Sequence, residues 1–477
     1  MKAERGFSTL EILIAMAVMF LVLGAVILVS FGNQTAVADS QTDAEAMNIA
    51  QGLLEQEQAD ARKDFNLVNS FATTSPDGFY HSTVTVEFEP DYLTKKVTAK
   101  VSWTGDHIRQ QSVSLVTEIT NFTNAVGANT CDSDLSGDWT VPTLAQSYDF
   151  ASLVGNPGGT YPITDVDAYN GKLYVTTNNS SGPATQPTFF VFSIHATDPL
   201  HPTLSLDSKI DNDTTAAGGL NALAVATNAG GSYAYVANSL SKQFQIINLS
   251  GPTVGASLTV AATGKGNSIY YKDGYVYEGL TSAAGGKEFN LIDVHTPTAP
   301  VLRGGAVVGN DINQIFVKGL YAYVASPNTQ QLKVYDVSNP ASIAAPVGSY
   351  TNNGAGNGKS VYAVGDSLYL GTTAAGAYYT RLDASTPQAP SFLSSSGFSS
   401  SVDGIIVRDS LAFLLTKTGF QVINATSTAQ YAAPLTLPSA GASALVEPTF
   451  DCENNIFYAA ANDNSGNGHL YLITPKP

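Results

Sequence analysis

The segment Ala322-Tyr323-Val324-Ala-Ser-Pro-Asn-Thr-Gln-Gln-Leu332-Lys-Val-Tyr-Asp336-Val-Ser-Asn-Pro340 holds two short apolar runs joined by a polar turn. Its first run, centred on an aromatic residue, recurs along the chain. The interval is about 42 to 46 residues, with one interval of about 61, and the aromatic residues are Tyr174, Tyr235, Tyr277, Tyr323, Tyr369, Phe413 and Tyr458. A regular interval of this size is typical of a repeat architecture in which each unit holds about four short strands.

The second run of the repeat also indicates β-structure. Several of these runs end in Asp-x-x-x-Pro, as in Asp336 to Pro340, and an aspartate ahead of a proline turn ends a strand because its carboxylate accepts hydrogen bonds from nearby backbone amides. The repeats resemble the LVIVD-type repeats of β-propellers. This resemblance implies an all-β propeller over 139–477, and the recurring aromatic cores predict seven blades. The strand-like segment 140–150 precedes the first full repeat, and we expect it to complete the last blade.

A polar residue recurs ten positions before most of the aromatic residues, where the innermost strand of a blade would begin. These residues are Thr164, Asn267, Asn313, Lys359 and Asp403, with Asn221 at the same place in a repeat that carries an insertion. Side chains there would line one mouth of the central channel and could hydrogen-bond a sugar or a peptide. The alternative is that they are polar only because the channel is wet. The sequence leaves both interpretations open.

The N-terminus carries the second informative pattern. Gly6-Phe7-Ser8-Thr9-Leu10-Glu11 is followed by an almost unbroken apolar run as far as Phe31. The motif resembles the processing site of type IV prepilins and of type II secretion pseudopilins. The resemblance implies that a prepilin peptidase cuts between Gly6 and Phe7 and methylates the new amine, and that this amine pairs with Glu11 of a neighbouring subunit in a filament. Residues 1–6 would then be a leader peptide.

The apolar run predicts a membrane anchor, because about twenty residues of helix span the ~30 Å hydrocarbon core of a bilayer. Lys2 and Arg5 precede it and no basic residue follows until Arg62, which favours a cytoplasmic N-terminus. We expect one helix over 7–64, with a transmembrane half at 10–31. A small antiparallel sheet over 65–122 would cover the helix, giving an α+β pilin domain, and 123–138 would link it to the propeller.

The remaining composition limits the chemistry. The chain holds two cysteines, Cys131 and Cys452, and in an exported protein their positions suit a disulfide. The formal net charge is −17, which disfavours binding to nucleic acid. The six histidines show no metal-ligand spacing, and the acidic loops at 132–138 and 462–467 lack a complete calcium pattern. We therefore expect no metal, no cofactor and no enzymatic activity.

Together these patterns predict a minor type IV pilin that assembles through its N-terminal helix and displays the propeller as an adhesion or ligand-binding module. Its expected partners are the prepilin peptidase, other pilin subunits, an inner-membrane assembly platform, and a surface glycan or protein. The precursor would cross the inner membrane once, with its C-terminus outside, before entering an extracellular filament. The alternatives are a major pilin or a pseudopilin with a structural propeller, and a pilin-anchored exported hydrolase.

Overall fold

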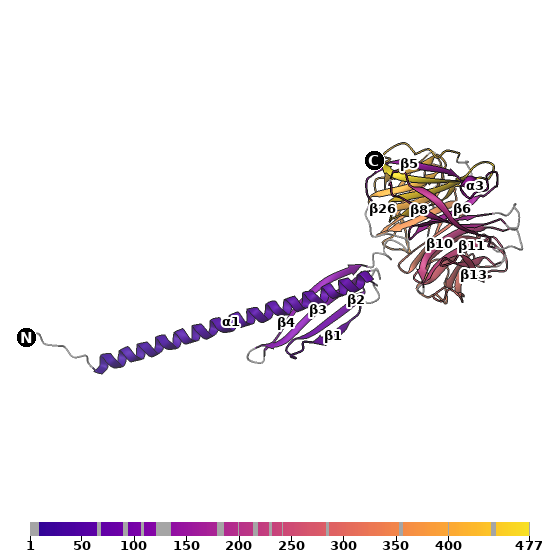
Figure 1. Cartoon of the computed structure of the whole chain (residues 1–477). Coiled ribbons are helices and arrows are strands. Elements are labelled where there is room, and N and C mark those ends of the chain that lie inside the picture. Colours follow the sequence, from indigo (N-terminus) through magenta and orange to yellow (C-terminus); the bar gives the residue numbers. More distant parts are fainter. Residues whose placement is uncertain are drawn as a thin grey trace, which may run out of the picture. The chain divides into compact units, whose positions relative to one another are not determined.

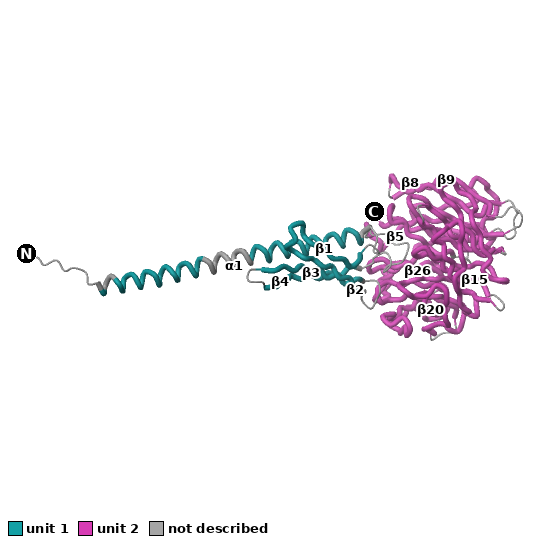
Figure 2. The backbone as a smooth tube through the Cα atoms, turned by 90° about the horizontal axis from the view of Figure 1, so that it is seen from below, with its two compact units in different colours: residues 1–121 teal, residues 122–477 magenta. Residues whose placement is uncertain are grey.

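The structure is a computed structural model, and its chain divides into two compact units, residues 1–121 and 122–477 (Figure 2). Gly6, Phe7 and Cys131 lie outside the described residues, as does most of the expected linker. The described residues are 9–63, 68–88, 94–105, 109–120, 135–178, 186–198, 200–212, 218–228, 231–240, 242–282, 286–352, 356–398, 400–439 and 445–476.

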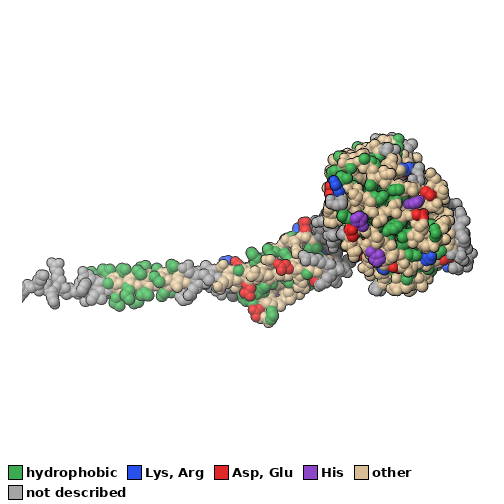
Figure 3. Space-filling view, turned by 45° about the horizontal axis from the view of Figure 1, so that its top comes forward, with side chains coloured by type: hydrophobic (Ala, Val, Ile, Leu, Met, Phe, Trp, Pro, Cys, Tyr) green, Lys and Arg blue, Asp and Glu red, His purple; other side chains and the backbone are tan. Residues whose placement is uncertain are grey.

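Unit 1 begins with one long helix, α1 (Thr9–Lys63), of 55 residues (Figure 1). The segment contains no proline, so no residue within it interrupts the backbone hydrogen bonds. Its window Leu13–Ser30 has a mean hydropathy of 2.9 and none of it is buried, which makes this helix long and apolar enough to cross a membrane. Hydrophobic side chains cover this part of the helix (Figure 3).

The second half of α1 packs on a sheet through Ala46, Ala50 and Leu54, which recur every four residues and are buried. The sheet is antiparallel, in the order β1-β2-β3-β4, and the helix lies against β3 and β4. All four strands lie within residues 65–122, where the sequence predicts a small antiparallel sheet. The strands are β1 (Phe71–Thr74), β2 (His81–Phe88), β3 (Thr94–Gly105) and β4 (Arg109–Thr120).

Strand β3 shows why this sheet has one apolar face. Val97, Ala99, Val101 and Trp103 alternate along it, and all four are buried. Because side chains alternate between the two faces of a strand, these four residues lie on the same side and meet the helix. Unit 1 therefore has a core of its own, formed between the sheet and the buried face of the second half of α1.

The described residues of unit 2 form strands and one turn of helix, and the strands make seven antiparallel sheets. The first three sheets follow the chain without crossovers. They are β6 (Ile163–Tyr169), β7 (Lys172–Thr177), β8 (Phe189–His195) and β9 (Thr203–Ile210); β10 (Leu220–Asn228), β11 (Gly231–Asn238), β12 (Phe244–Asn248) and β13 (Thr253–Leu258); and β14 (Gly266–Lys272), β15 (Tyr275–Leu280), β16 (Phe289–Asp293) and β17 (Val301–Ala306).

The next three sheets repeat this arrangement, although the third of them has three strands. They are β18 (Gln314–Lys318), β19 (Tyr321–Ala325), β20 (Leu332–Asp336) and β21 (Gly348–Tyr350); β22 (Gly358–Val364), β23 (Ser367–Thr372), β24 (Tyr379–Asp383) and β25 (Ser391–Ser396); and β26 (Val402–Arg408), β27 (Leu411–Thr416) and β28 (Gly419–Asn424). The last sheet is β29 (Leu445–Asp451), β30 (Ile456–Asn462), β31 (Gly468–Lys476) and β5 (Asp138–Asp149).

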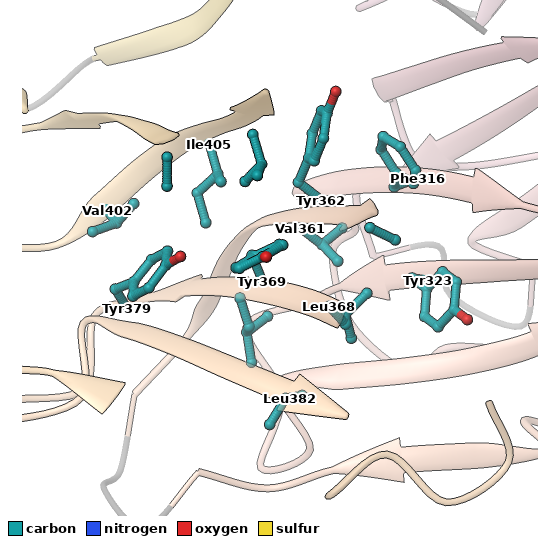
Figure 4. Packing of buried hydrophobic residues seen from close by; sticks show 14 of the residues in the cluster. Phe316, Tyr323, Val361, Tyr362, Leu368, Tyr369, Tyr379, Leu382, Val402 and Ile405 are labelled. Atoms are coloured by element: carbon teal, nitrogen blue, oxygen red, sulfur yellow. The ribbon is translucent and has the colours of Figure 1, made fainter. Parts of the chain in front are cut away.

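The sheets close into a ring. The first strands of successive sheets contact each other in the order β6, β10, β14, β18, β22, β26 and β29, and β29 returns to contact β6. This cyclic arrangement of antiparallel sheets around a central channel is a β-propeller. The recurring aromatic residues of the second strands are buried between the sheets, as Tyr323 and Tyr369 illustrate (Figure 4).

Ring closure uses both ends of the propeller sequence, as expected. Strand β5 pairs antiparallel with β31, for example Tyr148 with Leu470, and so supplies the fourth strand of the last sheet. Trp139 anchors this strand: it is buried, and its ring meets Phe413 and Phe457 edge to face at centroid distances of 5.5 and 5.1 Å. The strand then ends at Asp149, which caps the short helix α3 (Phe150–Leu153) by accepting a hydrogen bond from Ser152 N.

Candidate ligand site in the central channel

All six polar residues predicted at the starts of the inner strands line one cavity of about 190 Å³ in the channel. They are Thr164, Asn221, Asn267, Asn313, Lys359 and Asp403. Asn313 comes directly before β18. The other five each lie where the pairing register of the inner strand shifts by one residue, which is a β-bulge. A bulge redirects a side chain out of the regular alternation of the strand. The structure thus brings the six predicted residues together around one cavity, and ligand binding by them stays a prediction.

Four of these residues also have a structural role. Each donates a hydrogen bond to a backbone carbonyl of the next sheet, just before the equivalent residue there. The bonds are Thr164 Oγ1 to Leu220 O at 2.6 Å, Asn221 Nδ2 to Gly266 O at 2.6 Å, Asn267 Nδ2 to Ile312 O at 2.7 Å and Asn313 Nδ2 to Gly358 O at 2.5 Å. The series therefore ties five consecutive sheets together at the polar mouth of the channel.

Lys359 and Asp403 depart from this series. Between their two sheets the connecting bond comes from the neighbouring residue Ser360, whose Oγ donates to Val402 O at 3.2 Å. Asp403 Oδ2 instead accepts a hydrogen bond from Ser401 Oγ at 2.8 Å. Lys359 and Asp403, the two charged residues among the six, therefore do not take part in this series of inter-sheet hydrogen bonds.

A carboxylate cluster that the repeat alignment did not single out lies next to this ring. Asp165 and Asp167 are buried on β6, and Oδ2 of each accepts a hydrogen bond from the next inner strand, from Leu223 N and Val225 N respectively, both at 2.8 Å. Glu447 projects into the channel from a bulge in β29 and accepts a hydrogen bond from Gln314 Nε2. Carboxylates from the first and last sheets therefore share one part of the channel.

Burial and mutual repulsion change the acidity of this cluster. Desolvation is the main reason that the pKa of Asp165 lies well above its ordinary value, and the charges of Glu447 and Asp167 add to the effect. Desolvation also raises the pKa of Glu447 to about 7; the hydrogen bond from Gln314 opposes this rise and Asp167 supports it. The cluster consequently gains from any positive charge brought near it.

The other half of the channel is a second cavity of about 120 Å³ with aromatic walls. Tyr270, Phe316 and Tyr362 occupy the same position on three successive inner strands, three residues after Asn267, Asn313 and Lys359. Their ring centroids lie 5.2 Å apart between Tyr270 and Phe316 and 4.7 Å apart between Phe316 and Tyr362. Figure 4 shows Phe316 and Tyr362 side by side on neighbouring strands.

The remaining predicted site residues are only partly described. Cys452 takes part in a disulfide, and because Cys131 lies outside the described residues its pairing stays a prediction. The same holds for Gly6 and Phe7 at the processing site. Glu11 lies on α1, and its side chain is not described. Within the described ranges, no group of three or more His, Cys, Asp or Glu side chains is placed to hold a metal ion.

Comparison with known proteins supports the propeller. The LVIVD-repeat family model matches residues 309–351, which include the whole sheet from β18 to β21. No curated protein matches the chain in sequence. Among solved structures, the chain is similar to the β-propeller domain of Cps50 (Swd1) from Myceliophteria thermophila, with a TM-score of 0.50 and 10% identity over 70% of this chain and 100% of that one.

A second solved structure with similarity is PorZ, an essential bacterial surface component of the type-IX secretion system of Porphyromonas gingivalis. Its TM-score is 0.46 and its identity 9%, over 82% of this chain and 55% of that one. At these identities the similarity to the Cps50 domain concerns the fold alone. The chain is thus a β-propeller protein with an LVIVD repeat and a long N-terminal helix.

Proposed function

We propose that this protein is a minor type IV pilin subunit that presents its β-propeller outside the cell as an adhesion or ligand-binding module. The prepilin peptidase would cut between Gly6 and Phe7, and the mature helix would pack among the helices of other pilin subunits on the assembly platform. The seven sheets would serve as seven blades. In this proposal the propeller binds and does not catalyse, and no cofactor or nucleic acid takes part.

One observation carries the proposal: a single helix whose first half is apolar and exposed and whose second half packs on a small sheet. Leu13, Phe20 and Leu28 are 69%, 67% and 75% exposed. Apolar surface of this extent needs to be covered by lipid or by other helices. The prepilin-like motif Gly6-Phe7-Ser8-Thr9-Leu10-Glu11 directly before this surface favours a helix that first crosses a membrane and then packs in a filament.

The size of the propeller favours a low copy number. Unit 2 runs from residue 122 to residue 477, about three times the length of unit 1. If every subunit of a filament carried such a unit, neighbouring copies would compete for the same space at the filament surface. A minor subunit, present at the tip or at wide intervals, avoids this crowding.

The test combines processing with stoichiometry. Intact-mass analysis of the native protein should show loss of residues 1–6 and addition of one methyl group, and Gly6→Leu should abolish both changes while the matched substitution Ala3→Leu leaves them intact. Sheared filaments should contain the protein as a small fraction of the total pilin. A native chain that still starts at Met1 would contradict the pilin assignment. A filament composed mainly of this protein would contradict only its minor role.

A further inference from the structure

The polar mouth and the aromatic half of the channel differ in what they can offer a ligand. At the polar mouth, Thr164 and the three asparagines already donate hydrogen bonds to neighbouring sheets. The aromatic half instead is lined by aromatic rings and carboxylates around an open cavity of about 120 Å³. A cavity needs only about 10–15 Å³ to hold one water, so this cavity has room for a small organic group.

The two kinds of side chain lie on opposite arcs of the ring. The aromatic arc comes from the third, fourth and fifth sheets, on β14, β18 and β22, and the carboxylates come from the first and last sheets, on β6 and β29. Since the last sheet closes onto the first, the fourth sheet lies across the channel from them. On the second sheet, Ala224 stands at the aromatic position, and its small side chain leaves the space beside the aromatic arc open.

The charges of the lining are unbalanced. Its ionisable acids are Asp165, Asp167 and Glu447, and its basic side chain is Arg408. The Arg408 guanidinium already has an aromatic partner, because its Cζ lies 5.0 Å from the centroid of the Phe450 ring, and its Nη1 donates to Cys452 Sγ at 3.5 Å. This wall of the channel therefore already holds one organic cation over an aromatic ring.

A buried hydroxyl also faces the channel next to the carboxylates. Ser268 is 4% exposed, and its Oγ has no hydrogen-bond partner among the described residues. It lines the same cavity as Asp165 and Glu447 at the junction of the two channel halves. A buried hydroxyl without a partner is unfavourable, and a ligand donor or acceptor placed at this junction would supply the missing bond.

We propose that the aromatic half of the channel binds an organic cation, an ammonium or guanidinium group on an apolar stem, between the arc of Tyr270, Phe316 and Tyr362 and the carboxylates Asp165, Asp167 and Glu447. Aromatic faces attract cations by their quadrupoles, and a cation bound beside the carboxylates would favour their ionised form, which burial disfavours. A neutral sugar would stack on the rings but would not promote this ionisation, and an anion would oppose it. The ligand is therefore a basic side chain of a protein or a free amine.

The experiment uses the full chain in detergent micelles and isothermal titration calorimetry. Butylammonium is the probe, and butanol and butyrate are its neutral and anionic controls. We expect butylammonium to bind about tenfold more tightly than butanol and butyrate not to bind. Equal affinity for butylammonium and butanol would overturn the proposal. A Gly-Lys-Gly peptide, compared with its norleucine analogue, separates the two sources: tighter binding of the lysine peptide than of butylammonium indicates a protein ligand, and the reverse indicates a free amine.

Substitutions then locate the site. Glu447→Gln keeps the shape of the side chain and should weaken butylammonium binding about tenfold, and Tyr362→Leu should weaken it several-fold. Glu453→Gln is the matched control, since it neutralises an exposed carboxylate on the same closing sheet and should change nothing. Asp167→Asn provides a second variant if Glu447→Gln unfolds the chain, as judged by circular dichroism. Unchanged affinity in well-folded Glu447→Gln and Tyr362→Leu variants would refute the site.

This inference rests on the proposed function only in treating the propeller as the ligand-binding unit, and the two can fail separately. A protein that is processed and assembled into filaments but does not bind butylammonium would remove the cation site and leave the pilin assignment in place. Butylammonium binding by a protein that is never processed or assembled would remove the pilin assignment but leave the cation site in place.

Discussion

Glu278 gives the sharpest test of the packing between blades. It lies on β15 and pairs with Ile269 in the register. The equivalent residues on the other six second strands are apolar and, like Glu278, 0% exposed: Val175, Val236, Val324, Leu370, Leu414 and Ala459. Neither carboxylate oxygen of Glu278 has a hydrogen-bond partner among the described residues. Burial alone holds its pKa well above the ordinary value of 4.5. We expect Glu278→Leu to stabilise the propeller.

The size of the effect follows from two contributions. A buried polar group without a partner costs about 1–3 kcal/mol, and an apolar side chain of similar volume adds favourable burial, so we expect a gain of about 2–4 kcal/mol. For a unit of roughly 350 residues, at about 2.1 cal/mol/K of unfolding entropy per residue, this gain raises Tm by about 3–5 °C.

The effect should also depend on pH. Because the pKa of Glu278 is higher in the folded chain than in the unfolded chain, the folded state loses stability as the pH rises above 4.5 towards the folded value. Below 4.5 both states hold the proton, and only the cost of the neutral carboxyl group remains. The Tm difference between Glu278→Leu and the native chain should therefore be larger at pH 8 than at pH 4. Glu278→Gln should remove the pH-dependent part alone.

The assay can isolate the propeller, because the chain has two tryptophans, Trp103 in unit 1 and Trp139 in unit 2. In a Trp103→Phe background, tryptophan fluorescence follows the unfolding of unit 2 in the full chain. The exposed Glu453→Leu serves as a control and should leave Tm unchanged within about 1 °C. A Glu278→Leu variant that melts at or below the temperature of the native chain at pH 8 would show that Glu278 has a stabilising partner and would refute the reasoning.

Three further predictions concern contacts that hold the propeller together. Trp139→Ala should cost about 3–5 kcal/mol in the free energy of unfolding by removing the anchor of β5, whereas Val141→Ala, at an exposed position of the same strand, should cost less than 1 kcal/mol; chemical denaturation measures both. Asn267→Leu should remove the hydrogen bond to Ile312 O and lower the free energy of unfolding by about 1 kcal/mol. Hydrogen exchange should then become faster in β14 and β18 alone, and an equal increase across the whole propeller would contradict this prediction. Cys452→Ser should lower stability by about 2–4 kcal/mol without changing the far-ultraviolet circular dichroism, and equal stability of the two proteins under oxidising conditions would contradict a structural disulfide.

The inter-sheet bonds give a physical reason for the polar ring that the repeat alignment detected. A channel wall made of strand ends exposes backbone carbonyls, and buried carbonyls need donors. Asn267 and Asn313 supply such donors, because the amide nitrogen of each donates to a backbone carbonyl beside the next inner strand. A recurring asparagine at the start of an inner strand is therefore first a structural feature of the ring, and Asn221 Oδ1 also accepts a hydrogen bond from Asn178 Nδ2 at 2.8 Å.

Two features lay beyond the sequence patterns. Strand β1 has four residues, of which three are exposed, so it carries too few apolar positions to give a strand signal. The aromatic arc does follow a pattern, since Tyr270, Phe316 and Tyr362 share one position of the repeat, but that pattern does not place it in the channel. In the sequence, an aromatic residue of an inner strand looks equally suited to a buried core.

Patterns in the sequence were enough to predict the individual elements. They include the long helix without proline, the alternation along β3, the aromatic repeat and the strand β5 that completes the last sheet. Only the tertiary structure decided what the channel contains. Asp165 and Glu447 are separated by most of the propeller sequence, and they share a cavity because the ring closes and brings the first and last sheets together. Their proximity, and their position opposite the aromatic arc, depend on the curvature of the whole ring, which no local pattern encodes.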